Sequence, residues 1–308
     1  MRTLIDRLVF VFALVLIFLL TPLTASAHTV LSKGEIPPLW YTVKGIRTLP
    51  LQSSSHLGGK IRLNGTVWDT NSHWVGWYDG DGSETFNFVE GDWSNPCTYQ
   101  PIDYAHQLVN WVGLGGVHGG INSTLLQAGT WLRPDGQFHL FYELVGASDS
   151  SPHFSSMTFQ CGDFIHAEVD YNYYQTGTYK NHIYIQVKAR DDRTVLATID
   201  YAVPDANFIP DLYSADWIDE RPVCSDNVAP LYYNFTYLPD FVSVHWSNGH
   251  ADRIGYGIGA IGDFQTTNET MRQDISNAPL AHSITPGETS TSFTDAWDGF
   301  STDGGACP

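Results

Sequence analysis

The sequence is short of helical periodicity, of basic residues and of cysteine, and each shortage excludes a class of protein. Almost no segment repeats apolar residues at the spacing of an amphipathic helix, so a helical fold is disfavoured. Lys and Arg number 15 against 33 Asp and Glu, which makes nucleic acid and anionic membranes poor partners. The four cysteines form no Cys-x-x-Cys pair, which argues against a zinc site or a thioredoxin-like redox site.

The usual catalytic signatures are also missing. The sequence contains no HExxH, no GxSxG, no P-loop and no dinucleotide fingerprint. Its 12 histidines are scattered without the spacing of metal ligands. We therefore expect no metal ion and no cofactor.

Long apolar runs are confined to the start of the chain. A run of 13 apolar residues at 8–20 follows two arginines, and Ala-Ser-Ala at 25–27 fits a cleavage site. This pattern predicts a secretory signal peptide over residues 1–27, because a membrane-spanning helix needs about 20 apolar residues. We expect a secreted, extracellular chain that begins at His28 and has no membrane contact after cleavage. Export also makes disulfide bonds plausible, with three pairings open for Cys97, Cys161, Cys224 and Cys307.

Short runs rich in Val, Ile, Tyr, Phe, Thr and Trp make up most of the remaining chain. Examples are FIHAEVDYNYY at 164–174, HIYIQVKA at 182–189 and TVLATIDYAV at 194–203. Many of them alternate polar with apolar residues, and Gly, Pro, Asn and Asp turns separate them. This pattern predicts an all-β fold, an antiparallel β-sandwich of the jelly-roll or lectin-like kind.

Charge divides the chain after the predicted signal peptide. Residues 28–70 carry five basic and two acidic side chains, a net of +3, whereas residues 71–308 carry 8 basic and 30 acidic ones, a net of −22. We interpret 28–70 as a candidate pro-segment that lies across the acidic domain of 71–308 until carboxylates protonate near pH ~4. The alternative is that KIRLNGTVW at 60–68 is an edge strand that stays in the domain.

Two apolar strands carry polar residues that need an explanation. The stretch 122–145 predicts a hairpin with a Pro-Asp-Gly turn, yet Gln127 lies in its first strand and Glu143 in its second. A carboxylate among aromatic residues is costly unless it is hydrogen-bonded. These side chains therefore either face solvent or form a site.

A third run, SADWIDERP at 214–222, places acidic residues on both faces of one strand. The alternation puts Asp216 and Glu220 on the same face and Asp219 on the other. Two carboxylates on one face predict coupled titration of Asp216 and Glu220.

Four motifs together resemble a known enzyme family. WVGLGG at 111–116, LLQAG at 125–129, FYEL at 141–144 and ADWIDERP at 215–222 occur in that order. The series is similar to that of the glutamic peptidases, the eqolisins, over roughly residues 72–298. The sequence departs from the family pattern at Gly115, where the family has Asp, and at His139, where some members have Asp.

The resemblance implies a role for six residues. Gln127 and Glu220 match the catalytic Gln and Glu of the family. The supporting and substrate-binding positions match Trp111, Glu143, Asp216 and Trp217.

Peptide hydrolysis needs a base for water and a donor for the oxyanion. Glu220 and Gln127 meet these needs, and neither requires a neutral histidine, so the pair suits acid. We expect a secreted acid endopeptidase that acts on proteins or peptides as a monomer.

Two other functions are compatible with the residues. Glu143 and Glu220 are a candidate carboxylate pair for a jelly-roll glycosidase, although that function leaves Gln127 unexplained. Alternatively, 10 Trp and 16 Tyr on an acidic sandwich suit a non-catalytic, lectin-like module that stacks on sugars.

Overall fold

Nearly all regular structure in the computed structural model is β-strand. The structure describes residues 40–43, 46–47, 61–63, 66–71, 73–80, 82–99, 105–117, 123–147, 151–172, 180–205, 207–224, 234–264, 266–273, 278–284 and 291–300. The predicted signal peptide, residues 1–27, lies outside them and stays a prediction. All described residues belong to one unit, Pro38–Pro308, and none of them forms a helix that is long and apolar enough to cross a membrane.

The first layer of the sheet carries the motifs that resemble the glutamic peptidases. In spatial order it contains β1 (Trp40–Thr42), β10 (His153–Phe159), β9 (Phe138–Val145), β8 (Leu125–Leu132), β7 (Leu108–Gly115), β14 (Ala215–Glu220), β5 (Trp74–Asp79), β19 (Thr266–Arg272), β4 (Thr66–Asn71) and β3 (Ile61–Leu63). All neighbouring strands are antiparallel except β4 and β19, which run parallel. The predicted antiparallel hairpin is the pair β8 and β9.

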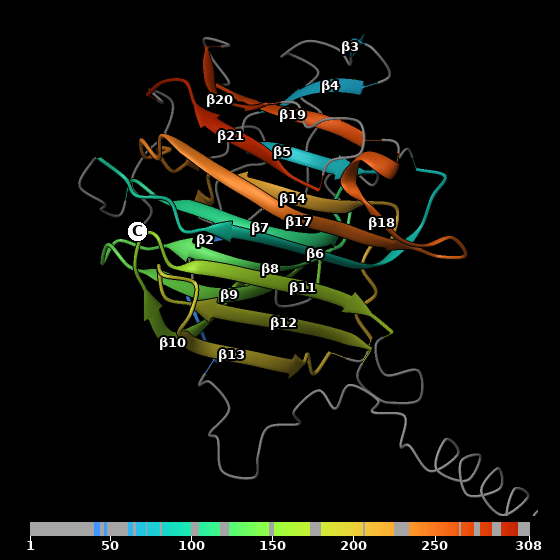
Figure 1. Ribbon diagram of the computed structural model, residues 1–308, viewed down its shortest axis with the longest axis horizontal. Coiled ribbons are helices and arrows are strands. Elements are labelled where there is room, and N and C mark those ends of the chain that lie inside the picture. The colour runs from blue at the N-terminus through green and yellow to red at the C-terminus, as the bar shows by residue number, and fades with distance from the viewer. Residues whose placement is uncertain are drawn as a thin grey trace, which may run out of the picture. The chain divides into compact units, whose positions relative to one another are not determined.

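The second layer continues from the first through β19. In spatial order it contains β13 (Val195–Ala202), β12 (Asn181–Lys188), β11 (Phe164–Tyr171), β6 (Phe86–Ser94), β17 (Ser243–Arg253), β21 (Phe293–Trp297) and β20 (Pro279–Ile284). β20 pairs with the last residues of β19, which closes the connection between layers. β18 (Gly257–Ala260) pairs with the end of β17, and a 3₁₀ turn, η2 (Ile261–Asp263), follows it. Figure 1 shows these strands, and the predicted β-sandwich is confirmed.

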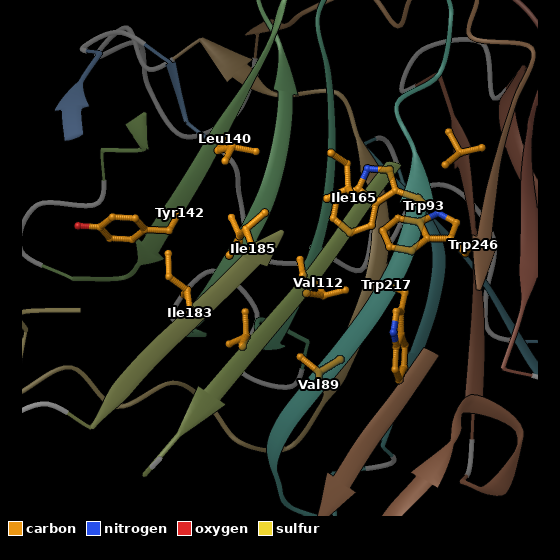
Figure 2. Close-up of a cluster of buried hydrophobic side chains, with 14 of the residues drawn as sticks. Val89, Trp93, Val112, Leu140, Tyr142, Ile165, Ile183, Ile185, Trp217 and Trp246 are labelled. Carbon is orange, nitrogen blue, oxygen red and sulfur yellow. The ribbon is translucent and has the colours of Figure 1, made fainter. Parts of the chain in front are cut away.

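The main core lies between the two layers. Alternate residues of each strand point into it, as in β11, where every second residue is buried. Figure 2 shows Trp93 and Trp246 from the second layer beside Trp217 and Val112 from the first. Burial of this many aromatic and branched side chains supplies the main free energy of folding.

A smaller cluster covers the other face of the first layer. It contains Trp74, Tyr78, Val109, Trp111, Leu125, Trp131, Phe141, Val145, Phe154 and Ile218, all buried. The strands that carry it are therefore apolar on both faces, and β5, β7, β8, β9 and β14 are buried at every position. Polar residues on this face are consequently enclosed rather than solvated.

The N-terminal segment contributes strands to the same unit. β1 pairs with β10, β2 (Ile46–Arg47) pairs with β15 (Val223–Cys224), and β4 pairs with β19. β15 also pairs with β16 (Asn234–Phe235) in a small separate sheet. The alternative of an edge strand near 60–68 is therefore supported for β3 and β4.

A disulfide bond joins the segment that follows β6 to the segment that precedes β11. Cys97 and Cys161 are bonded, with their Cα atoms 4.8 Å apart and 64 residues between them in sequence. The sequence left three sets of cysteine pairs open, and this bond agrees with the set that contains Cys97–Cys161. The side chain of Cys224 and all of Cys307 lie outside the described residues.

Candidate active site

Gln127 lies in the middle of β8 with its side chain on the face of the smaller cluster. It is fully buried, and its cross-strand neighbours are Gly113 in β7 and Glu143 in β9. Its Nε2 donates a hydrogen bond to Oε2 of Glu143 over 3.3 Å. The amide and the carboxylate that stood out in the sequence therefore meet each other across the hairpin.

Glu220 is the last residue of β14 and is also fully buried. Nε1 of Trp111 donates a hydrogen bond to its Oε2 over 2.9 Å. The Trp111 ring packs edge-on against Trp74, with 4.9 Å between ring centroids, and Trp74 is the cross-strand neighbour of Glu220 in β5. One indole thus holds the carboxylate, and a second indole packs against the first. A hydrogen bond to a carboxylate favours its ionised form.

Asp216 shares the face of Gln127 but not the surroundings of Glu220. Its cross-strand neighbour in β7 is Gly113, which is also the neighbour of Gln127. Burial raises the pKa of Asp216 well above its usual range, the Ser214 hydroxyl opposes this rise, and the charges of Asp211 and Glu269 add to it. Asp216 and Glu220 are four residues apart on one strand, or about 13 Å, so the predicted coupling between them is wrong.

Trp217 does not line this face. It is buried in the main core on the opposite face of β14, where Figure 2 shows it beside Val89 and Val112. Its Nε1 donates to the backbone oxygen of Glu90 in the second layer over 2.7 Å. The expectation that Trp217 supports substrate binding is therefore wrong, because adjacent residues of a strand point to opposite faces.

Glu269 belongs to this face and was missed by the sequence reasoning. It is fully buried in β19, opposite Gly76 of β5, which in turn is opposite Ile218 of β14. The strand around it, TTNETMR at 266–272, has a single large apolar residue, Met271. A strand signal that weak gave no sign that a carboxylate is enclosed there.

The two departures from the family pattern have local explanations. Gly115 has φ +93°, and a Cβ at this position would collide with the backbone oxygens of Asp211 and Thr124. An Asp therefore does not fit at position 115 in this chain. His139 lies on the face of Glu143 in β9 but bonds elsewhere, through Nε2 to Asp135 over 2.8 Å.

The first described residues of the chain pack over this face. Tyr41 makes a hydrogen bond with Nδ1 of His139 over 3.3 Å, and its ring contacts Phe154 at 5.8 Å between centroids. Val43 packs against the smaller cluster. Gln127 and Glu220 are fully buried, so a substrate reaches them only after some part of the chain around them moves.

This face holds groups that can exchange protons and donate hydrogen bonds. It combines a neutral amide donor, a carboxylate held by an indole, and two further enclosed carboxyl groups at Glu143 and Asp216. A carboxylate can remove a proton from water, and an amide N–H can stabilise an oxyanion.

Comparison with known proteins agrees with this fold. The scytalido-glutamic peptidase structure with a peptide-based transition-state analogue matches with a TM-score of 0.53 and 17% identity, over 74% of this chain and 99% of that one. SCP-B, an eqolisin solved with the tripeptide Ala-Ile-His, matches with a TM-score of 0.52 and 16% identity, over the same shares. No curated protein sequence matches the chain.

The family itself is shown by sequence. The model of the peptidase A4 family matches residues 72–290, which is most of the chain and contains all six residues that the motifs singled out. The start of the match agrees with the first strand of the resemblance, at about residue 72. The chain therefore belongs to the peptidase A4 family, the eqolisins, and is a peptide-bond hydrolase.

Proposed function

We propose that the chain is a secreted acid endopeptidase in which Glu220 is the general base and Gln127 stabilises the oxyanion. The observation that supports the proposal is that Glu220 and Gln127 are both enclosed on one face of the first layer. Asp216 is level with Gln127 across Gly113, and Glu220 lies four residues further along β14, so the substrate has to span this offset. Trp111 bonds the carboxylate of Glu220, and Glu143 bonds the amide of Gln127. These are the residues that the family resemblance implies.

Glu220 begins the reaction by removing a proton from a water molecule as the water oxygen attacks the peptide carbonyl carbon. The carbonyl oxygen becomes an oxyanion, and the N–H of Gln127 donates to it. Glu220 then passes its proton to the amide nitrogen, the C–N bond breaks, and an amine and a carboxylic acid leave. The carboxylate of Glu220 is regenerated, so that protons balance over the cycle.

The supporting residues set the geometry of this pair. An amide nitrogen carries two hydrogens, so the bond to Glu143 orients the Gln127 amide while one N–H can serve the oxyanion. Trp111 keeps Glu220 in one position and favours its ionised form at low pH. Both roles follow from hydrogen bonds that are already formed.

Membership of a peptidase family removes support from the two other functions compatible with the sequence. A glycosidase would use Glu143 and Glu220 as its pair, yet Glu143 is bonded to Gln127 and Glu220 to Trp111. A lectin-like module would hydrolyse nothing, so any cleavage of casein excludes it.

Substitution of the pair tests the mechanism. Gln127→Ala should lower kcat by about 10²- to 10³-fold, the usual cost of one oxyanion donor. Glu220→Gln keeps the shape of the side chain but removes the base, and should lower casein cleavage at about pH 4 by at least 10²-fold. Full activity in either folded variant would refute the assignment.

Asp219→Asn is the matched control for Glu220→Gln. It changes the adjacent carboxyl of the same strand, which faces the main core and accepts a hydrogen bond from Asn110 over 2.6 Å. Near-ultraviolet circular dichroism should be unchanged in all three variants, and only Asp219→Asn should keep its activity.

A further inference from the structure

The outer face of the second layer carries a cluster of histidine and glutamate side chains, far in the fold from the candidate active site. Glu90 lies in β6, His166 and Glu168 lie in β11, and His250 lies in β17. These strands are neighbours, and inward residues such as Val89 and Ile165 fill the main core on their other face. The four side chains are 20% to 27% exposed, so solutes can reach them.

The ligand atoms of this cluster converge on one point. Nε2 of His166 lies 2.8 Å from Oε1 of Glu168 and 4.0 Å from Oε2 of Glu90, and one ligand atom from each of the three residues lies within 4.8 Å of the others. Ligands that bind zinc at about 2.0–2.2 Å lie roughly 3–4 Å apart in a tetrahedron. The spacing therefore suits a single metal ion.

His250 places a fourth nitrogen beside these atoms. Its Nδ1 lies 3.1 Å from Oε1 of Glu90. Glu90 is the cross-strand neighbour of Glu168 on one side and of His250 on the other. A small shift of the His250 side chain would complete four protein ligands from three strands.

Asp92 orients the central histidine in the manner of known metal sites. Its Oδ1 lies 2.6 Å from Nδ1 of His166, and the two residues are direct cross-strand neighbours. A carboxylate that holds the Nδ1 proton leaves Nε2 as the ligand atom, which is the usual arrangement around zinc-bound histidine. Nε2 of His166 is the atom that points at Glu90 and Glu168.

The charges of the surrounding strands favour a cation. Glu90 and Glu168 lie directly opposite each other, and like charges in that position destabilise a sheet. Asp170 and Asp252 are both cross-strand neighbours of Phe88, one step further along the same face. Five carboxyl groups thus surround two imidazoles, and a divalent ion would offset their repulsion.

We propose that Glu90, His166 and Glu168, with His250 as the fourth ligand, bind one divalent transition-metal ion, with zinc the best match. Imidazole and carboxylate ligands together suit zinc among such ions. The ion would join β6, β11 and β17 and stabilise the second layer. It would take no part in peptide hydrolysis, because Gln127 and Glu220 lie on the outer face of the other layer.

Titration of the purified full chain with ZnCl₂, followed by calorimetry at about pH 7, tests the proposal. Neutral histidine is required for binding, so metal and proton compete, and binding should release protons and be lost at about pH 4. We expect one ion per chain and a rise in melting temperature. Absence of one-to-one binding at pH 7 would overturn the site.

Substitutions locate the ion. His166→Gln and Glu168→Gln should each weaken zinc binding by at least about 100-fold, and Asp92→Asn by about 10- to 100-fold, as is typical for residues that hold a metal ligand. Near-ultraviolet circular dichroism and casein cleavage in acid should be retained. If both ligand variants bind zinc as the unchanged chain does, the proposal is wrong.

His282→Gln is the matched control. His282 also pairs with a carboxylate, with Nδ1 2.8 Å from Oδ2 of Asp298, but it is outside the set of ligand atoms that converge on His166. Its loss should leave zinc binding unchanged. Loss of the binding in His282→Gln would place the ion elsewhere and overturn the proposal.

Discussion

At the scale of single residues, Trp111 does more than fill space. Its indole donates to Glu220 while its ring packs on Trp74. A hydrogen bond to a charged group typically contributes about 1.5–3 kcal/mol. The same tryptophan therefore positions the proposed base and helps it stay ionised in acid.

Trp111→Phe should lower kcat/KM in acid by about 10- to 100-fold, the equivalent of that hydrogen bond. The ionised base loses a donor, so the acidic limb of the pH–rate profile should move to higher pH. Activity against casein measured from about pH 2 to 6 checks this shift. A profile of unchanged shape and position would show that Trp111 acts only through packing.

Asp216→Asn tests the revised environment of Asp216. Because the pKa of Asp216 is raised by burial and by Asp211 and Glu269, the carboxyl is already neutral in acid, and an amide resembles that form. We expect kcat/KM and its acidic limb to be unchanged. Movement of that limb would indicate that Asp216 does titrate with the proposed base.

Residue types were easier to predict than their neighbours. The motifs singled out Gln127, Glu143 and Glu220 because amides and carboxylates are unusual in apolar strands. The pair Gln127–Glu143 lies within the predicted hairpin and depends on its register. The pair Trp111–Glu220 joins strands 109 residues apart, which no local pattern contains. Trp217 was expected at the site because it belongs to the same motif as Asp216 and Glu220. The alternation of side chains along β14, however, already puts it on the opposite face.

At the scale of elements, register explains how the site is assembled. Gly113 in β7 is the neighbour of Gln127 on one side and of Asp216 on the other. A glycine at this point leaves room between two polar side chains. If residue 113 had a Cβ, that atom would lie 2.8 Å from the ring of Trp111. Glycine therefore also lets the Trp111 indole adopt its position.

Strand content was predictable, whereas strand partners were not. Alternating runs such as FIHAEVDYNYY identified β11 and its neighbours. The parallel pair of β4 and β19, and the route of β19 from one layer to the other, follow from tertiary packing of segments about 200 residues apart. The metal-ligand cluster was missed for the same reason, since its histidines come from different strands and have no motif spacing.

The N-terminal segment should be removed in acid before the enzyme reaches full activity. Residues 40–43 contact side chains of the site face from the edge strand β1, beside β10, whereas β3 and β4 lie at the other edge, beside β19. We therefore expect the new N-terminus to lie between residues 48 and 61, rather than at 71. N-terminal sequencing during incubation at about pH 3.5, with activity measured alongside, follows both events.

Glu220→Gln is the control for self-processing. This variant should keep its N-terminal segment in acid unless active enzyme is added. Full activity of the unchanged chain with His28 still at its N-terminus would rule out a pro-segment. The charge contribution rests on the five basic residues Lys33, Lys44, Arg47, Lys60 and Arg62. Of these, the three lysines and the side chain of Arg62 lie outside the described residues.

At the scale of the whole molecule, the two layers share a polar bridge across the main core. Asp219 of β14 and Asp295 of β21 are both fully buried, and they lie close enough for the charge of Asp219 to act on Asp295. Burial raises the pKa of Asp219 to about 7 and that of Asp295 well above its usual range. In acid the pair shares protons, whereas at higher pH it places two charges between the layers.

The direction of the resulting pH dependence follows from proton binding. An aspartate in the unfolded chain has a pKa of about 3.9, so between about pH 4 and 7 the folded state holds more protons than the unfolded state. Stability must then fall as pH rises through this window. Asp79 and Asp170 contribute in the same direction, since burial raises the pKa of both.

We therefore predict that the melting temperature is highest near pH 4 and falls steadily toward pH 7 and above, opposite to the usual behaviour of proteins with salt-bridged carboxylates. Asp295→Asn should flatten this fall, because an amide keeps a hydrogen-bonding group beside Asp219 without gaining charge. Calorimetric melting at half-unit pH intervals, with the metal chelated throughout, measures both effects. A melting temperature that rises between pH 4 and 7 would mean that the buried pair stays ionised and is stabilised by other charges, and Asp295→Asn would then destabilise the chain at every pH.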